Sequence, residues 1–295
     1  MVRGLLAVMV VLTGCAHGSR VTEPPRGRAF WLSLRDAKFA LPAGESQEAV
    51  LRDAETLVDS EDPVLRDEVG YGLVVAWVYQ QKSVPAPALL ELTSRLQERL
   101  KNLASPVLGR SFSALSLSII AAAELKQPVL SQSQFDALVE AATDELVLEP
   151  DLRGHDAKLG WIHATAHTAD LLKFLARDDR LTGGQQDRII NAIVHRLSHG
   201  TSFVWGEEER LAAVLRSLIM RKDARVPVMT AWLGTLGPAW KRLWSTPVLN
   251  RDEYAHLSNV KLTLRSLYVS LSASEQTPMV DATRADVLEA LSALQ

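Results

Sequence analysis

The stretch Leu108–Lys126, with the sequence LGRSFSALSLSIIAAAELK, decides the fold class. Drawn as an α-helix, it has apolar residues on nearly every side, and a helix of that kind is covered by protein all round. Its most apolar part, Ser116–Leu125, is about ten residues long and so is too short to cross a bilayer. We therefore expect this segment to be the central helix of a domain built from helices.

Further helices are predicted on both sides of this central segment. From about Glu45 onward, apolar residues recur every three or four positions, and no strand-like alternation persists. About eleven helices are predicted, with centres some 22–27 residues apart, so a helix pair repeats at roughly 45 residues, near the period of HEAT and armadillo units. The breaks carry Pro or Gly, at Pro85, Pro106, Pro128, Pro150, Gly183-Gly184, Gly200, Pro227, Pro247 and Pro278.

The predicted fold class is therefore all-α. We favour an irregular helical-repeat superhelix of the HEAT or armadillo kind, and the alternative is a bundle of (α/α) toroid type. Residues 45–295 are expected to form a single all-helical domain with a sizeable core. Residues 1–14 are expected to be a signal peptide, and residues 15–44 a lipidated cysteine followed by a flexible tether.

The N-terminus has the features of a lipoprotein signal peptide. Met1-Val2-Arg3 is a positive start, Leu5–Leu12 is apolar, and Leu12-Thr13-Gly14-Cys15 matches the bacterial lipobox. The match implies that Cys15, the only cysteine, becomes mature residue one and carries acyl chains such as palmitate, which together make a stable membrane anchor. Ala16 lacks the Asp that often marks inner-membrane retention, so the outer membrane, facing the periplasm, is favoured. An ordinary secretory signal with a chance Cys is the alternative.

The composition narrows the range of partners. Hydrophobic residues make up 47% of the chain and charged residues 23%, which is typical of a folded protein. The formal net charge is −3 and the Lys and Arg residues are scattered, so the basic stripe that nucleic-acid binding needs is missing. The expected partners are the membrane, through the lipid anchor, and a protein, peptide or small polar ligand.

The densest chemistry lies in Asp151–Asp156 and Gly160–Asp170, which hold three of the seven histidines. If the second segment is helical, His163, His167 and Asp170 share one face, and Trp161 points elsewhere. Two His one helical turn apart can bind one metal ion such as zinc, with a carboxylate from Asp170, Glu207 or Glu208 completing the site. A zincin has Glu directly after the first His, whereas this chain has Ala164. The alternative is a histidine pair whose nitrogens are satisfied inside a helical core.

Charged clusters enter several apolar helices, at Arg66-Asp67-Glu68, Arg110 and Glu207–Arg210. Buried charges are costly unless they are paired, so clusters on separate helices are expected to meet in one internal network or along one cleft. The catalytic candidates are His163, His167, Asp170 and Glu208. The predicted binding groove comprises Arg66, Asp67, Glu68, Arg110, Asp151, Arg153, Trp161 and Arg210, with Trp77 and Trp205 beside it.

These same residues resemble a bacterial family, the domain of unknown function DUF2785. The resemblance runs through Arg66-Asp67-Glu68 with Tyr71, Arg110–Ser113, Asp151–Gly154, the specific run Gly160-Trp161-Ile162-His163 with Ala166-His167 and Ala169-Asp170, and Glu208–Ala212. It covers roughly Asp62 to Ala212 and extends loosely through Leu264–Leu271. The resemblance implies an all-helical protein and brings no biochemical activity. The lipobox departs from the soluble form that the family implies.

Three functions are compatible with these patterns. The first is a binding or scaffold lipoprotein with a polar concave groove. The second is a metal-dependent or acid/base hydrolase that uses His163 and His167. The third is a purely structural network. No nucleophile elbow, P-loop or dinucleotide fingerprint is present, and paired carboxylates for glycoside cleavage remain an alternative. The residues His195, His199 and His256 are interpreted as surface or capping histidines.

Overall fold

The computed structural model describes residues 25–295, and the predicted signal peptide and Cys15 lie outside this range. The helices are α1 (Gly27–Asp36), α2 (Gln47–Glu55), α3 (Gly72–Val74), α4 (Ala86–Lys101), α5 (Val107–Glu124), α6 (Gln132–Leu148), α7 (Ala164–Leu175), α8 (Gly183–Leu197), α9 (Glu207–Ile219), α10 (Pro227–Trp244), α11 (Arg251–Ser272) and α12 (Pro278–Ala293). A 3₁₀ segment, η1 (Thr56–Asp59), follows α2, and two π-helical segments, η2 (Val64–Tyr71) and η3 (Val75–Gln80), flank α3. The strands of the described part are β1 (His155–Asp156) and β2 (Gly160–Trp161). The all-α prediction is confirmed.

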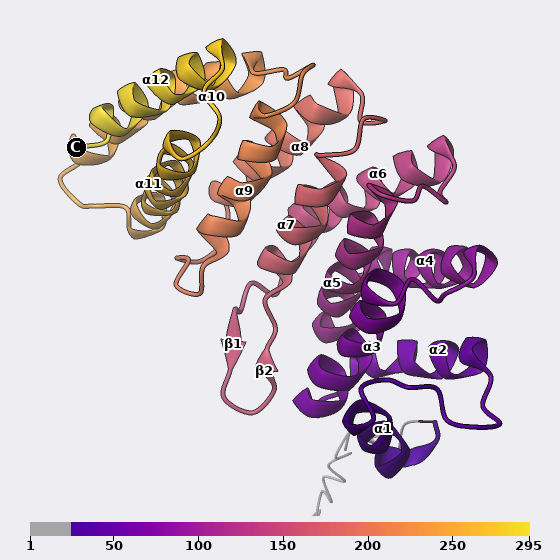
Figure 1. Cartoon of the computed structure of the whole chain (residues 1–295). Helices are drawn as coiled ribbons and strands as arrows, with labels where there is room; N and C mark the ends of the chain where they lie inside the picture. The colour runs from indigo at the N-terminus through magenta and orange to yellow at the C-terminus, as the bar shows by residue number, and fades with distance from the viewer. Residues whose placement is uncertain (1–24) are drawn as a thin grey trace, which may run out of the picture.

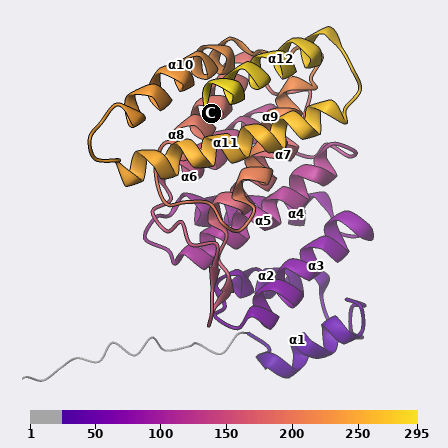
Figure 2. The same ribbon diagram turned by 90° about the vertical axis from the view of Figure 1, so that its left-hand side faces the viewer.

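The helices are stacked in a curved array from α1 to α12, and most of them belong to one of two layers that run side by side along it (Figure 1). In the first layer the segment η2–α3–η3 packs against α5, α5 against α7, α7 against α9 and α9 against α11. In the second layer α2, α4, α6, α8 and α10 pack in that order. Figure 2 shows α10, α11 and α12 at one end and α1 at the other. The assignment to HEAT or armadillo repeats stays a prediction.

Helix α5 is the core helix that its sequence predicts. It packs mainly against α7 and α4, and Leu117 and Ile120 are fully buried. Within residues 25–295, α5 is the one helix with the length and composition to cross a membrane, but 78% of it is buried inside the domain. Its apolar surface is therefore covered by neighbouring helices.

The N-terminal boundary of the domain differs from the prediction. Helix α1 lies inside the predicted tether 15–44, and Trp31 and Leu34 on this helix are buried in the core. The Trp31 indole N–H also donates to the carbonyl of Pro25 at 2.8 Å. The prediction of a flexible tether is therefore wrong for Gly27–Asp36, because Trp31 and Leu34, three positions apart on one side of the helix, are buried where α1 packs against η2.

The segment Gly160–Asp170, which holds His163 and His167, is not one continuous helix. Strands β1 and β2 pair as an antiparallel hairpin, with His155 opposite Trp161. The Asp156 carboxylate closes the hairpin turn by accepting from the amides of Lys158 and Leu159, both at 2.9 Å. Helix α7 starts at Ala164, so Trp161 lies on a strand and its direction is not set by the helical period.

Candidate functional site

A pocket of about 520 Å³ opens where η2, α5, the hairpin, α7 and the start of α9 meet. We call it the His–Trp pocket. Its lining residues are Asp67, Tyr71, Phe112, Leu115, Trp161, His163, His167, Asp170, Trp205 and Arg210. Its volume lies within the range of small-molecule sites. Six of the predicted site residues line it, namely Asp67, Trp161, His163, His167, Asp170 and Arg210.

The hairpin is held against η2 by Arg66, whose side chain is fully buried. Its guanidinium donates to the carbonyl of Leu159 at 2.8 Å and to that of Ser60 at 3.1 Å, and it lies 4.5 Å from the centre of the Phe112 ring. The same guanidinium donates to Asp67 at 2.7 Å. Burial raises the pKa of the Asp67 carboxyl, and the charge of Arg66 opposes that shift. Arg66 therefore lies behind the pocket wall and positions it.

His163 is the residue before the first turn of α7, and its backbone is left-handed, with φ 51°. Its Nε2–H donates to the carbonyl of Trp205 at 3.0 Å, and its ring stacks on Trp161 at 4.9 Å between centroids. The Glu207 carboxylate lies 3.8 Å from the same nitrogen. Burial lowers the pKa of His163, although Glu207 partly opposes the shift. His163 is therefore a neutral imidazole that joins the hairpin to the loop before α9.

His167 is buried in the first turns of α7, and its tautomer follows from its partner. The Ser111 hydroxyl donates to the carbonyl of Ile162, so its oxygen accepts from Nδ1–H of His167 at 2.8 Å. The Nε2 atom then carries the lone pair, on a ring that lines the pocket. Burial lowers the pKa of His167 well below its ordinary value, and the nearby His163 contributes a smaller effect in the same direction. The ring is a neutral base, held by Ser111 and packed edge-on against Phe112 at 5.0 Å.

Asp170 lies one turn after His167 and is engaged by two cations. Lys173 donates to it at 2.8 Å, and Arg210 of α9 donates to its second oxygen. The Asp170 side chain is buried, whereas that of Arg210 is about half exposed. This ion pair connects α7 to α9 at the pocket floor, with the guanidinium edge available to a ligand.

A family model described as "Protein of unknown function (DUF2785)" matches residues 92–269, which is more than half of the chain. The chain belongs to the DUF2785 family. The predicted membership is confirmed. The matched range starts later than the predicted Asp62, and it ends inside the looser predicted extension through Leu264–Leu271. No curated protein and no solved structure matches the chain.

The arrangement of His163 and His167 in this DUF2785 protein bears on the metal hypothesis. Their ring centroids are 5.6 Å apart, and each ring keeps one nitrogen that no described side chain or carbonyl engages. Carboxylates are the missing part. Asp170 is held by Lys173 and Arg210, and Glu207 accepts from the amide of Trp205 at 2.9 Å. Within residues 25–295, no group of three His, Cys, Asp or Glu side chains is placed to hold a metal ion.

Other predicted groove residues of the DUF2785 chain lie away from the His–Trp pocket. Glu68 is exposed and pairs with Arg35 at 2.6 Å. Arg110 is buried and pairs with Glu149 at 2.6 Å. Asp67 lines the pocket, whereas Glu68, the next residue of η2, is turned toward Arg35 of α1.

Asp151 and Arg153 pair with each other at 2.7 Å and line a separate hollow beside Gly200. Glu208 does not line the pocket, and burial raises the pKa of its carboxyl. Trp77 is buried in the core, where its indole donates to the carbonyl of Phe39. The predicted groove is thus divided among several places.

Three pocket residues were absent from the predicted groove: Tyr71, Phe112 and Leu115. Ser111, which orients His167 from behind, was also missed. The sequence did contain a signal, because Ser111 and Phe112 lie four and three positions before Leu115 and so share its side of α5. The all-round apolar character of that helix concealed which face meets α7.

Proposed function

We propose that this chain is an envelope lipoprotein whose His–Trp pocket binds a small, uncharged, polyhydroxylated ligand such as a saccharide unit. The anchor rests on the lipobox at Cys15. The observation that supports the binding role most strongly is the pair of half-exposed tryptophans above a histidine of fixed tautomer. The following contacts support each part of the proposal.

Two tryptophans supply the apolar wall of the pocket. Trp161 is 42% exposed and Trp205 is 45% exposed, and their rings meet edge to face at 5.8 Å. His155 packs edge-on against Trp161 at 5.0 Å. His163 stacks on one face of Trp161, so the exposed remainder of the two indole rings forms the wall. Exposed aromatic surface beside polar groups is typical of sites that bury the apolar side of a ligand.

The charges of the pocket are already paired within the protein. Asp67 pairs with Arg66, and Asp170 pairs with Lys173 and Arg210. A charged ligand would therefore lack an unpaired counterion, which favours an uncharged one.

The remaining polar atoms suit hydroxyl groups, which both donate and accept. His167 Nε2 accepts, the free edge of Arg210 donates, and Tyr71 offers a phenol whose pKa is raised by burial, so that it stays a donor. Such a combination of fixed donors and acceptors is matched by a ligand with several hydroxyls.

The test is a titration of the full chain in detergent with a panel of monosaccharides and disaccharides, followed by tryptophan fluorescence and saturation-transfer NMR. Trp161→Ala should weaken binding about tenfold, since an aromatic contact contributes on the order of 1–1.5 kcal/mol. Trp244→Ala is the matched control, because Trp244 is 57% exposed and lies outside the pocket. Absence of binding across the panel, or equal affinity of Trp161→Ala and the parent, overturns the proposal.

A second function, acid/base hydrolysis, is favoured by one observation. Ser111, itself bonded to the Ile162 carbonyl, engages Nδ1 of His167 as an orienting group engages a catalytic base, and it leaves Nε2 unengaged on a ring that lines the pocket. A water activated there would attack a ligand on the tryptophan wall. Turnover of a bound saccharide that His167→Gln abolishes, with binding retained, would establish this function. Binding without turnover leaves the first one.

A further inference from the structure

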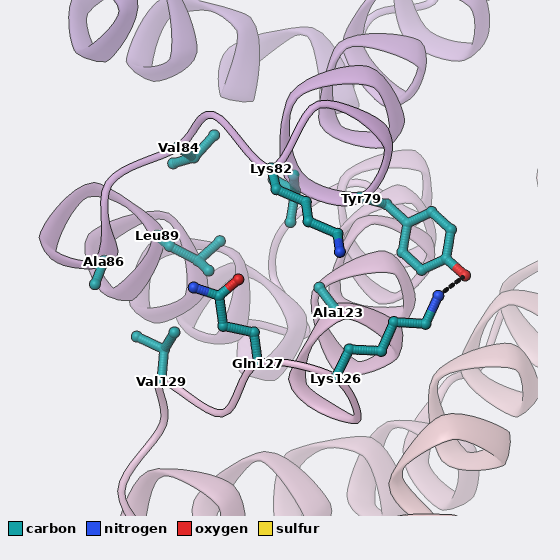
Figure 3. A pocket seen from close by; sticks show the side chains of 10 residues that line it. Tyr79, Lys82, Val84, Ala86, Leu89, Ala123, Lys126, Gln127 and Val129 are labelled. Atoms are coloured by element: carbon teal, nitrogen blue, oxygen red, sulfur yellow. Dashed lines mark hydrogen bonds between the residues drawn. The ribbon is translucent and has the colours of Figure 1, made fainter.

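A second cavity lies at the C-terminal ends of η3 and α5, where the start of α4 closes it (Figure 3). We call it the lysine cavity. The His–Trp pocket, by contrast, lies beside η2 and the first turns of α5. Along α5, Phe112 and Ala123 mark the two sites, and eleven residues of helix separate them by about 16 Å. The walls of the cavity are apolar and include Val78, Val84, Leu89 and Val129. The two sites are therefore separate and can be tested separately.

The lysine cavity is small, with a volume of about 70 Å³. An apolar cavity of about 150 Å³ holds a benzene molecule, so this one has room for roughly three or four carbon atoms. An isopropyl or isobutyl group fits such a space, whereas a long acyl chain does not.

The polar side of the cavity is cationic. Figure 3 shows the Lys82 ammonium and the Gln127 carboxamide reaching toward the space from different sides. Lys126 donates to the Tyr79 hydroxyl at 3.2 Å and lies 4.8 Å from the centre of that ring. No acidic side chain lines the cavity within the described part of the chain.

The nearest carboxylate in sequence, that of Glu124, is engaged elsewhere. It accepts from the amide of Val129 at 2.8 Å and pairs with Arg180 at 3.0 Å. The positive charge of Lys82 and Lys126 beside the cavity is therefore available to an anion.

The backbone at Lys82 is unusual for its residue type. Lys82 has φ 52°, in the left-handed region, where the helical segment ends and Ser83 N–H donates back to the Trp77 carbonyl at 2.9 Å. Glycine is the usual residue at this position of a helix end, because a Cβ there costs free energy. A lysine at this position places its ammonium over the cavity.

We propose that the lysine cavity binds a short, branched aliphatic carboxylate. The branched tail fills the space between Val84, Leu89 and Val129, and the carboxylate accepts from Lys82, Lys126 and Gln127. This chemistry is shared by a free short-chain acid and by the C-terminal residue of a peptide ending in Val or Leu.

Calorimetry and saturation-transfer NMR on the full chain in detergent test the proposal with four probes. Isovalerate represents the free acid and N-acetyl-leucine represents a chain end. Isovaleramide and N-acetyl-leucinamide are their uncharged counterparts. We expect at least one carboxylate to bind in the millimolar range, and its amide to bind roughly tenfold more weakly.

Two exposed lysine substitutions test the cation site without disturbing the core. Lys82→Gln and Lys126→Gln should each weaken carboxylate binding roughly three- to tenfold. Lys101→Gln at the far end of α4 should leave it unchanged. Lys82→Gly removes the ammonium and suits the left-handed backbone, so it should fold at least as well as the parent and still lose affinity.

Each outcome separates the alternatives. Binding of N-acetyl-leucine alone identifies a peptide chain end, and binding of isovalerate alone identifies a free acid. Binding of neither carboxylate, equal binding of acid and amide, or full affinity in Lys82→Gly overturns the proposal. Trp161→Ala, which alters the His–Trp pocket, should bind the carboxylate as tightly as the parent. Failure of the saccharide proposal therefore leaves the test of the lysine cavity unaffected.

Discussion

Replacing Arg66 with alanine tests whether this side chain holds the hairpin in place. The substitution removes a fully buried guanidinium that donates to the carbonyls of Leu159 and Ser60 and to Asp67. It leaves those carbonyls without their donor and Asp67 half-buried without its partner. Breaking one partner of a buried charge pair costs about 3–5 kcal/mol. The hairpin, and Trp161 with it, then loses its attachment to η2.

Urea unfolding and thermal melting measure the expected loss. At about 2–4 °C per kcal/mol for a domain of this size, a loss of about 3–5 kcal/mol should lower the Tm of Arg66→Ala by roughly 6–20 °C. Acrylamide quenching should also rise as Trp161 becomes more accessible. Arg28→Ala is the matched control, since its side chain is 52% exposed and has one ion pair at 2.9 Å, with Asp62, so a change under about 1 kcal/mol is expected. Equal effects of the two substitutions refute the anchoring role of Arg66.

Four further predictions concern protonation, metal and lipid. The folded-state pKa of His167 lies below its unfolded value, so the unfolded chain binds more protons and stability falls as pH drops below about 6.5. Urea titrations at several pH values should show a shallower fall in His167→Gln than in the parent, and equal falls contradict this assignment. Burial raises the pKa of Glu145 to about 8, so the folded chain keeps a proton that the unfolded chain releases above about pH 4.5. The free energy of unfolding should therefore decline between pH 4.5 and pH 8, and this decline should disappear in Glu145→Gln. A parent protein whose stability does not change between pH 7 and 8 contradicts the prediction. Protein purified without chelator should contain far less than one equivalent of zinc, manganese or iron by mass spectrometry, because Asp170 and Glu207 already accept hydrogen bonds from other groups of the protein. If the parent instead contains one equivalent and the double variant His163→Ala/His167→Ala contains none, the metallohydrolase hypothesis is restored. Cys15→Ser should shift the chain from the membrane pellet to the supernatant on ultracentrifugation, and labelling with a palmitate analogue should be lost; equal labelling of both forms contradicts the lipobox assignment.

The sequence alone predicts the helices and the central place of α5, because helical periodicity and all-round apolarity are local properties of the chain. It also predicts that His163, His167 and Asp170 lie together, since residues three or four positions apart on a helix share one face. The helical period accounts for His167 and Asp170 only, because His163 precedes α7 and reaches the pocket through a left-handed backbone.

The tertiary structure alone decided which charges meet. Arg66 and Arg110 turn inward to bind Leu159 and Glu149, whereas Glu68 turns outward to Arg35. No local pattern distinguishes these cases, since partners tens of residues apart are set by how the helices stack. The Ser111–His167 bond has the same origin, because it depends on the packing of α5 against α7. Long-range packing therefore turned a set of charged clusters into one pocket, one anchored hairpin and several separate ion pairs.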